Sequence, residues 1–143
     1  MNLSEHFTLQ ELIESPTARK AGIDNTPDAP TIANLQRLCQ LLEGARELVG
    51  APLLISSGYR CPALNRLIGG ADNSAHVQGL AADFTVVGLP PRQVVELIAD
   101  SSLAFDQVIL EFDRWVHVAV SARAPRRQVL TLRKGTGYLA GVA

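Results

Sequence analysis

The most informative segment of the sequence is Ser74-Ala75-His76-Val77-Gln78-Gly79-Leu80-Ala81-Ala82-Asp83. It passes from a polar, irregular stretch (71–79) into an apolar run (80–87) that predicts a β-strand. Asp83 lies inside that run, where a carboxylate is costly to bury unless it is paired or binds a metal. His117 interrupts another apolar run in the same way. His76, Asp83 and His117 therefore form a candidate metal site, since two imidazoles and a carboxylate suit tetrahedral zinc with one open position.

Structural roles also explain these residues when each is taken alone. A histidine within a strand is more often a hydrogen-bonded core or cross-strand residue than a ligand. Asp83 would suit the cap of a turn or an ion pair with an arginine. Spacing alone therefore supports the metal site and the structural roles about equally.

Hydrophobic periodicity predicts a single α+β domain over residues 1–143, with N-terminal helices packed on a small antiparallel sheet. Helices are expected at about 7–13, 31–49, 63–68 and 90–101, and strands at about 53–56, 80–87, 108–111, 115–120 and 128–133. Thr8 and Glu11 have the spacing of a capping box, and a tight turn at Asp113-Arg114 predicts a hairpin. The core that carries the motifs spans about 53–120. The glycine-rich end, 134–143, is expected to be a flexible tail.

Composition excludes several classes of protein. The 143 residues are 47% hydrophobic and 19% charged, which is typical of a globular domain. A net charge of −1 provides no basic field for nucleic acid, and no apolar run approaches the ~20 residues of a membrane span. The first residues contain no basic region followed by an apolar stretch, so no secretory signal is visible. Cys39 lies on the apolar stripe of a helix, which favours core packing, and nothing requires a disulfide with Cys61.

The motif S-x-H-x-x-G-x-A-x-D at 74–83, followed by Trp115-x-His117, resembles the zinc D-alanyl-D-alanine carboxypeptidase family. That family includes D-Ala-D-Ala dipeptidases and phage L-alanyl-D-glutamate endolysins. The segment 57–62, Ser-Gly-Tyr-Arg-Cys-Pro, is similar to the family's S-G-Y-R-[ST]-P, and F-T-L-x-E-L at 7–12 resembles its compact phage and prophage branch. The resemblance implies an α+β fold shared with the hedgehog signalling domain, and zinc held by His76, Asp83 and His117.

The same resemblance implies roles for residues around the metal. Arg60 matches an arginine that faces the metal and binds the substrate carboxylate or the developing oxyanion, and its planar guanidinium suits bidentate contact. Tyr59, Ser74 and Gln78 are expected to join it in binding substrate. Ser74 is expected either to hydrogen-bond the substrate or to orient the loop. The alternative for Gln78 is that it is a solvent-exposed residue without a role in binding.

The general base is less clear, because the family places an acid three residues before the last histidine and this chain has Arg114 there. Glu111 and Asp113 are the nearby acids. With a two-residue turn, Leu110 opposes His117 and Glu111 points away. With a three-residue loop, we expect Glu111 to oppose His117 and to share its face. We favour Glu111 as the base, with Asp113 as the alternative. If Glu111 has no catalytic role, it is expected to be a charged residue that points outward from the edge of the sheet.

The predicted function is a zinc metallopeptidase that hydrolyses peptidoglycan peptides, either as a D-Ala-D-Ala carboxypeptidase or as a murein endopeptidase of phage or prophage type. The alternatives are a non-catalytic zinc module that binds cell wall or protein, favoured by Arg114 at the usual base position, and a zinc-free assembly module. The expected partner is a peptidoglycan peptide substrate, with no nucleic acid and no membrane span. The protein is expected to be cytoplasmic until released, or phage-associated, and to act on the cell wall.

Overall fold

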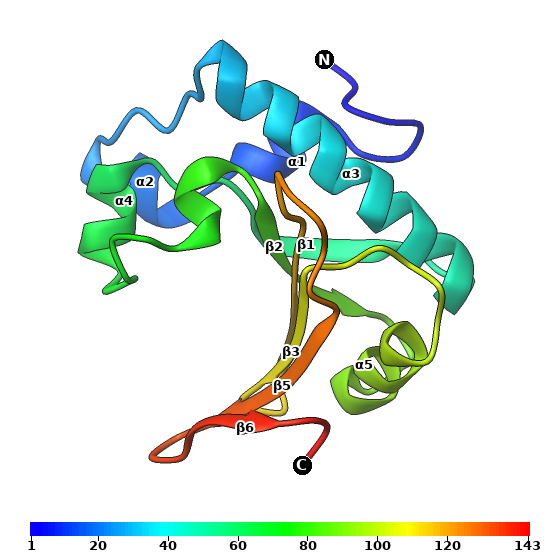
Figure 1. Ribbon diagram of the computed structural model, residues 1–143. Helices are drawn as coiled ribbons and strands as arrows, with labels where there is room; N and C mark the ends of the chain where they lie inside the picture. The colour runs from blue at the N-terminus through cyan, green and yellow to red at the C-terminus, as the bar shows by residue number, and fades with distance from the viewer.

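A curved sheet with the strand order β1-β2-β4-β3-β5-β6 runs through the molecule, and the computed structural model describes all residues, 1–143 (Figure 1). The strands are β1 (Leu53–Ser57), β2 (Ala81–Val86), β3 (Gln107–Glu111), β4 (Trp115–Ala119), β5 (Gln128–Arg133) and β6 (Gly137–Ala140). Neighbouring strands are antiparallel except β3 and β5, which are parallel. Helices precede and flank this sheet, so the prediction of an α+β fold is confirmed.

Five α-helices and one 3-10 helix accompany the sheet. They are α1 (Leu9–Ile13), α2 (Pro16–Ala21), α3 (Ala29–Val49), α4 (Pro62–Leu67), η1 (Ala75–Gln78) and α5 (Pro91–Ala99). The capping box predicted from Thr8 and Glu11 is present at the start of α1. The long helix α3 begins earlier than predicted, because Asp28 caps it and Pro30 is tolerated in the first turn.

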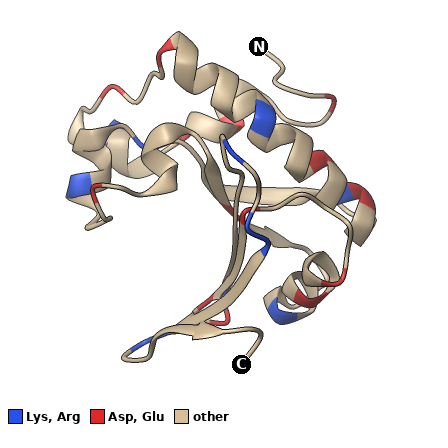
Figure 2. Cartoon of the chain, in the orientation of Figure 1, with Lys and Arg blue, Asp and Glu red and all other residues tan.

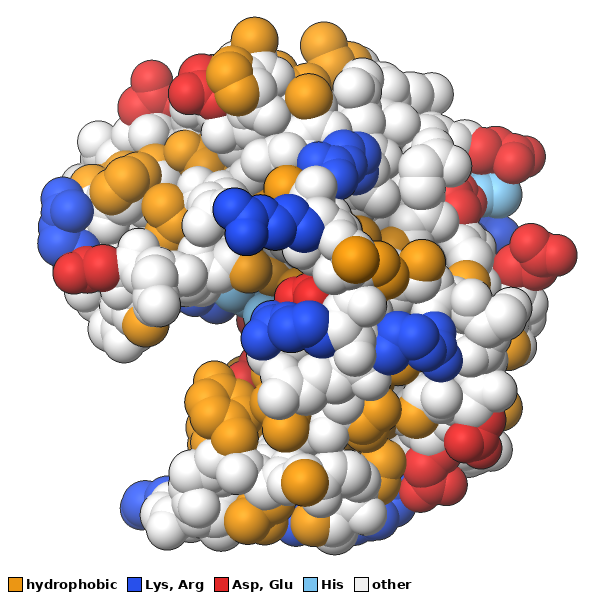
Figure 3. Space-filling model, viewed as in Figure 1, with side chains coloured by type: hydrophobic (Ala, Val, Ile, Leu, Met, Phe, Trp, Pro, Cys, Tyr) orange, Lys and Arg blue, Asp and Glu red, His pale blue; other side chains and the backbone are white.

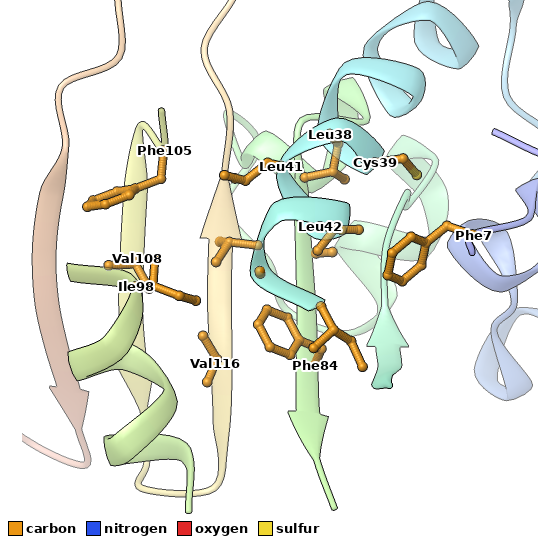
Figure 4. Close-up of a cluster of buried hydrophobic side chains, with 14 of the residues drawn as sticks. Phe7, Leu38, Cys39, Leu41, Leu42, Phe84, Ile98, Phe105, Val108 and Val116 are labelled. Atoms are coloured by element: carbon orange, nitrogen blue, oxygen red, sulfur yellow. The ribbon is translucent and has the colours of Figure 1, made fainter. Parts of the chain in front are cut away.

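The two faces of the central strands differ in character. Phe84, Val108 and Val116 point toward α3 and α5, where they form the hydrophobic core with residues of those helices (Figure 4). Because side chains alternate along a strand, Asp83 and His117 point to the opposite face. The alternation thus separates the hydrophobic core from the polar residues singled out in the sequence. No helix in the structure combines the length and the hydropathy needed to cross a membrane.

A bulge in β1 and a close contact behind it shape the loop that follows. The register shifts between Ile55 and Ser57, so that Ser57 rather than Ser56 pairs with Asp83. The chain then passes against α1, where the backbone N–H of Tyr59 donates to the carbonyl oxygen of Leu12 at 2.7 Å. This approach places the loop above the polar face of the sheet.

The C-terminal residues differ from the flexible tail that the sequence predicted. β6 pairs with β5 through four residue pairs, and the hydroxyl of Thr131 donates to the carbonyl oxygen of Gly141 at 2.7 Å. Gly135 and Gly137 adopt φ values of 78° and 65°, which let the chain turn tightly between the two strands. The glycines therefore form a hairpin turn, and the prediction of a loose end was wrong.

Basic and acidic residues are interspersed over the helices and strands (Figure 2). Their number is nearly balanced, with 13 Lys and Arg against 14 Asp and Glu. The distribution agrees with the absence of a broad basic field in the sequence.

Replacement of Gly58 by alanine is predicted to destabilise the fold. A Cβ at this position would clash with the backbone carbonyl of Leu12, which cannot move without displacing α1. We expect Gly58→Ala to lower the free energy of unfolding by about 1–3 kcal/mol, as overpacking does elsewhere. Urea unfolding followed by circular dichroism measures this change.

Gly44→Ala is the matched control. A Cβ at Gly44 would meet only the flexible side chain of Leu103, and alanine favours the helix by about 1 kcal/mol. This variant should be as stable as the parent or more so. Equal stability of Gly58→Ala and the parent would contradict the packing described for the loop.

Candidate metal centre

The side chains of His76, Asp83 and His117 meet on the polar face of the sheet, each offering a ligand atom within 4.8 Å of the others. Asp83 on β2 and His117 on β4 are direct cross-strand partners. His76 comes from η1, which lies over the end of β2. The structure therefore brings together the three residues that the sequence analysis identified as candidate ligands.

The orientation of His76 is set by its own loop and by the loop after β1. Its Nδ1 lies 2.7 Å from the carbonyl oxygen of Gly58, and a carbonyl only accepts, so Nδ1–H is the donor. Nε2 therefore faces the ligand set, and it lies 3.4 Å from the Asp83 carboxylate. The backbone N–H of Arg60 in turn donates to the carbonyl oxygen of His76 at 3.1 Å. These two bonds join segment 57–62 to the first ligand and direct its Nε2 toward the site.

Asp83 is buried among positive and hydrogen-bonding groups. Its Oδ1 lies 2.9 Å from His117 Nδ1, and its Oδ2 lies 3.5 Å from an Arg60 guanidinium nitrogen. Burial alone would raise the pKa of Asp83, but the hydrogen bonds and charges of His117 and His76 hold it well below its ordinary value. The carboxylate is ionised, as a metal ligand must be, so the donor set of two imidazole nitrogens and one carboxylate fits zinc.

Glu111 shares this face, but its register differs from the expected one. The turn is a three-residue loop, so Glu111 pairs with Trp115 and Ile109 lies opposite His117. The prediction that Glu111 opposes His117 directly was wrong by two residues, a shift that leaves the side chain on the same face. Glu111 Oε1 lies 3.7 Å from His117 Nδ1 and accepts a hydrogen bond of 3.1 Å from the Trp115 indole. The indole thus fixes the carboxylate beside the ligand set.

The surroundings of Glu111 favour a proton acceptor. Burial raises the pKa of Glu111, the attraction of His117 opposes this, and the negative charge of Asp83 raises it further. The net direction is upward, so the surroundings favour the protonated form of Glu111 more than water does.

Asp113, the alternative base, lies elsewhere. Phe112 and Asp113 adopt φ values of 55° and 56°, which carry the loop around and away from the ligand set. The Asp113 carboxylate is half exposed and accepts hydrogen bonds from Arg133 at 2.8 and 3.0 Å. Neither Asp113 nor Arg114 lines the cleft above the ligands. Of the two candidate bases, only Glu111 lines it.

Arg60 lines the same cleft and is held by two side chains. Its Nε donates to Ser57 Oγ at 3.1 Å, and a terminal nitrogen donates to Asn65 Oδ1 at 3.3 Å. Asn65 is almost fully buried, and its Nδ2 donates to the carbonyl oxygen of Ala71 at 2.8 Å. Asn65 and the indole of Trp115 are positioning groups that the sequence motifs did not reveal. The sequence did hold a signal for Asn65, because its amide side chain lies among the apolar residues of a predicted short helix.

The other expected substrate-binding residues divide between the cleft and the interior. Ser74 lines the cleft, and its hydroxyl accepts the backbone N–H of His76 at 3.3 Å, capping η1. Tyr59 is a member of the hydrophobic core and does not line the cleft. Gln78 lies outside the cleft too, and its backbone carbonyl accepts a hydrogen bond of 2.9 Å from Asn34. Arg60 and Ser74 therefore line the cleft, whereas Tyr59 and Gln78 lie outside it.

The cleft itself is open and has a volume of about 810 Å³. One wall comes from the segment 70–76, and the other from β5 and β6. Figure 3 shows it as a deep hollow on the left of the molecule, with pale-blue histidine atoms at its base. His76 and His117 thus line a cleft that is large enough for a short peptide.

Comparison with known families identifies a match over most of the chain. Residues 5–119 match the family described as Peptidase M15. No curated protein matches the sequence. The matched range includes every candidate ligand and Glu111, and it ends before β5 and β6 begin.

The purified protein is predicted to bind one zinc ion, and His76→Ala is predicted to lose it. Removing one of three ligands leaves a carboxylate and a single imidazole, which are too few to retain zinc during dialysis. Elemental analysis after dialysis measures the metal content. Because an ion that binds only the folded state stabilises it, zinc should also raise the melting temperature of the parent and not of the variant.

His6→Ala is the control, since His6 lies near the N-terminus and contacts Glu43 instead of the ligand set. It should retain zinc in full. A His76→Ala protein that keeps all its zinc would exclude His76 from the site.

Proposed function

The chain belongs to the peptidase M15 family, a family of metallopeptidases, and from this membership we propose that it is a zinc peptidase that hydrolyses the short peptides of peptidoglycan. One observation carries the proposal. The carboxylate of Glu111 is held by Trp115, 3.7 Å from a ligand nitrogen, and it faces an open cleft. A site built only to stabilise a fold has no need of a free acid beside an accessible metal.

The roles of the residues follow from their positions. A zinc ion held by His76, Asp83 and His117 would supply a Lewis acid that polarises the scissile carbonyl and lowers the pKa of water. Glu111 accepts the proton of the attacking water and delivers it to the leaving amine, a general acid–base role that its position beside the ligand set and in the cleft supports.

Arg60 binds the substrate on the other side of the ligand set. Its guanidinium lies in the wall of the cleft and is oriented by Ser57 and Asn65. A carboxylate of the substrate, or the oxyanion that develops at the scissile carbonyl, is the group that such a fork binds best. We assign Arg60 this role, with Ser74 beside it on the same wall.

Peptidoglycan peptides are the proposed substrate class because of the sequence resemblance to D-Ala-D-Ala carboxypeptidases and phage endolysins. The segment 7–12, similar to the phage and prophage branch, favours an enzyme that reaches the cell wall after release. The proposal covers both a D,D-carboxypeptidase and a murein endopeptidase, which release different products from purified peptidoglycan.

A non-catalytic zinc module remains the second candidate function. Its support was Arg114 at the position where the family usually has its acid. Glu111 now supplies an acid on the same face of the sheet as His117, so that support is weaker. Zinc-loaded protein that binds peptidoglycan without hydrolysing it would favour this second function.

Glu111→Gln is predicted to lower turnover by roughly 10²–10⁴, the usual contribution of general acid–base catalysis, while zinc binding stays intact. The amide keeps the shape of the side chain and cannot accept the proton. Release of amino groups from purified peptidoglycan measures turnover, and elemental analysis measures zinc.

Asp113→Asn is the control, because Asp113 is paired with Arg133 outside the cleft. Its turnover should match that of the parent. If Asp113→Asn loses activity and Glu111→Gln keeps it, the base is Asp113 and the geometric argument fails.

Arg60→Lys is predicted to raise KM or lower kcat while zinc content and melting temperature change little. Lysine keeps the positive charge and loses the planar fork, along with the contacts to Ser57 and Asn65. Arg66→Lys, on an exposed position of α4, is the matched control. Unchanged kinetics of Arg60→Lys would count against a role in substrate binding.

A further inference from the structure

The floor of the cleft continues beyond the metal ligands as one row of cross-strand partners. Asp83 pairs with His117, His117 with Ile109, Ile109 with Leu130, and Leu130 with Ala140. Directly paired residues point to the same face of a sheet, so the row leads from the ligand set across β3, β5 and β6. Its outer part is aliphatic and lines the cleft.

An exposed aromatic residue borders this aliphatic row. Tyr138 on β6 lines the cleft although 62% of its surface is exposed. It pairs with Leu132, which pairs with Glu111, so Tyr138 lies on the same line across the sheet as the proposed base. Partial burial and the negative charges of Glu111 and Asp83 raise the pKa of Tyr138.

The opposite border of the row is polar. The side-chain amide of Gln107 donates to that of Gln128 at 2.7 Å, and Arg126 pairs with the buried carboxylate of Asp106 at 2.7 Å. All four residues line the cleft. A narrow aliphatic floor between an aromatic border and a polar border has the character of a peptide-binding groove, in which an apolar pocket takes a side chain and polar groups take the backbone.

The ligand set divides the cleft into two halves. Arg60 and Ser74 lie on the side of β1 and η1, and the row with Tyr138 lies on the side of β5 and β6. If Arg60 binds a carboxylate on the carboxyl side of the scissile bond, the residues on its amino side extend over Ile109, Leu130 and Tyr138. This half is built largely by β5 and β6, which lie outside the 5–119 range that matches the family.

We infer that Tyr138 is a specificity-determining residue, which covers an aliphatic side chain of the substrate, on the amino side of the scissile bond, against Ile109 and Leu130. The inference rests on the proposed function for the identity of the substrate. It assigns to the C-terminal hairpin a preference for a peptide of several residues over a dipeptide.

Calorimetric titration with two probes tests this inference. Every protein in the titration is zinc-loaded and carries Glu111→Gln, which keeps the probes from being hydrolysed during the measurement, and Glu111→Gln alone is the parent for these comparisons. The probes are the pentapeptide L-Ala-D-Glu-L-Lys-D-Ala-D-Ala and the dipeptide D-Ala-D-Ala, which has a single residue on the amino side of the scissile bond. The parent should bind the pentapeptide more tightly than the dipeptide. Tyr138→Ala should weaken the pentapeptide about tenfold, the effect of losing one aromatic contact surface, and leave the dipeptide unchanged. Tyr138→Phe should bind both as the parent does.

Val87→Ala is the control, since Val87 is also exposed and lies outside the cleft. It should bind both probes as the parent does. Equal binding of the pentapeptide by the parent and Tyr138→Ala, equal weakening of both probes, or no binding of the pentapeptide by the parent would each overturn the inference. Hydrolysis of peptidoglycan by the protein with Glu111 intact, measured in parallel, tests the proposed function separately, because the titration requires no turnover.

Discussion

The buried carboxylate of Asp83 is the constraint on which the rest of the structure depends. An unpaired charge at this depth would destabilise the fold, and the chain surrounds it with His117 across the strand pair, His76 from η1 and Arg60 from the loop after β1. These contacts require the bulge in β1, the close approach of Gly58 to α1, and the two backbone-linked hydrogen bonds between segments 58–60 and 76. The residues that satisfy the charge are the ones that present a metal site to the cleft.

Local patterns predicted much of this arrangement. The capping box at Thr8, the apolar strands and the polar interruptions at Asp83 and His117 depend on neighbours in sequence, and the structure has them as expected. Quantities that depend on loop length or on distant partners were harder to predict. A loop of three residues instead of two decides the register of Glu111, and Tyr59 enters the core because its backbone bonds to Leu12. The glycines near the C-terminus indicated flexibility, but pairing with β5 gives them a hairpin.

The two faces of the sheet have different roles, and this difference connects the fold to the chemistry. One face packs on α3 and α5 and provides rigidity, and the other carries the ligands, the acid and an aliphatic floor in a single register. Because cross-strand partners hold these groups, their spacing depends on backbone hydrogen bonds more than on flexible side chains. The family match ends with β4, and the hairpin that follows extends the same face.

The most direct test of this account is the position of zinc in crystals of the zinc-loaded protein, located from anomalous differences measured on both sides of the zinc absorption edge. The account predicts a single dominant peak about 2.0–2.2 Å from His76 Nε2, an Asp83 carboxylate oxygen and His117 Nδ1. The absence of a peak there, or a dominant peak at another cluster such as His6 and Glu43, would contradict it.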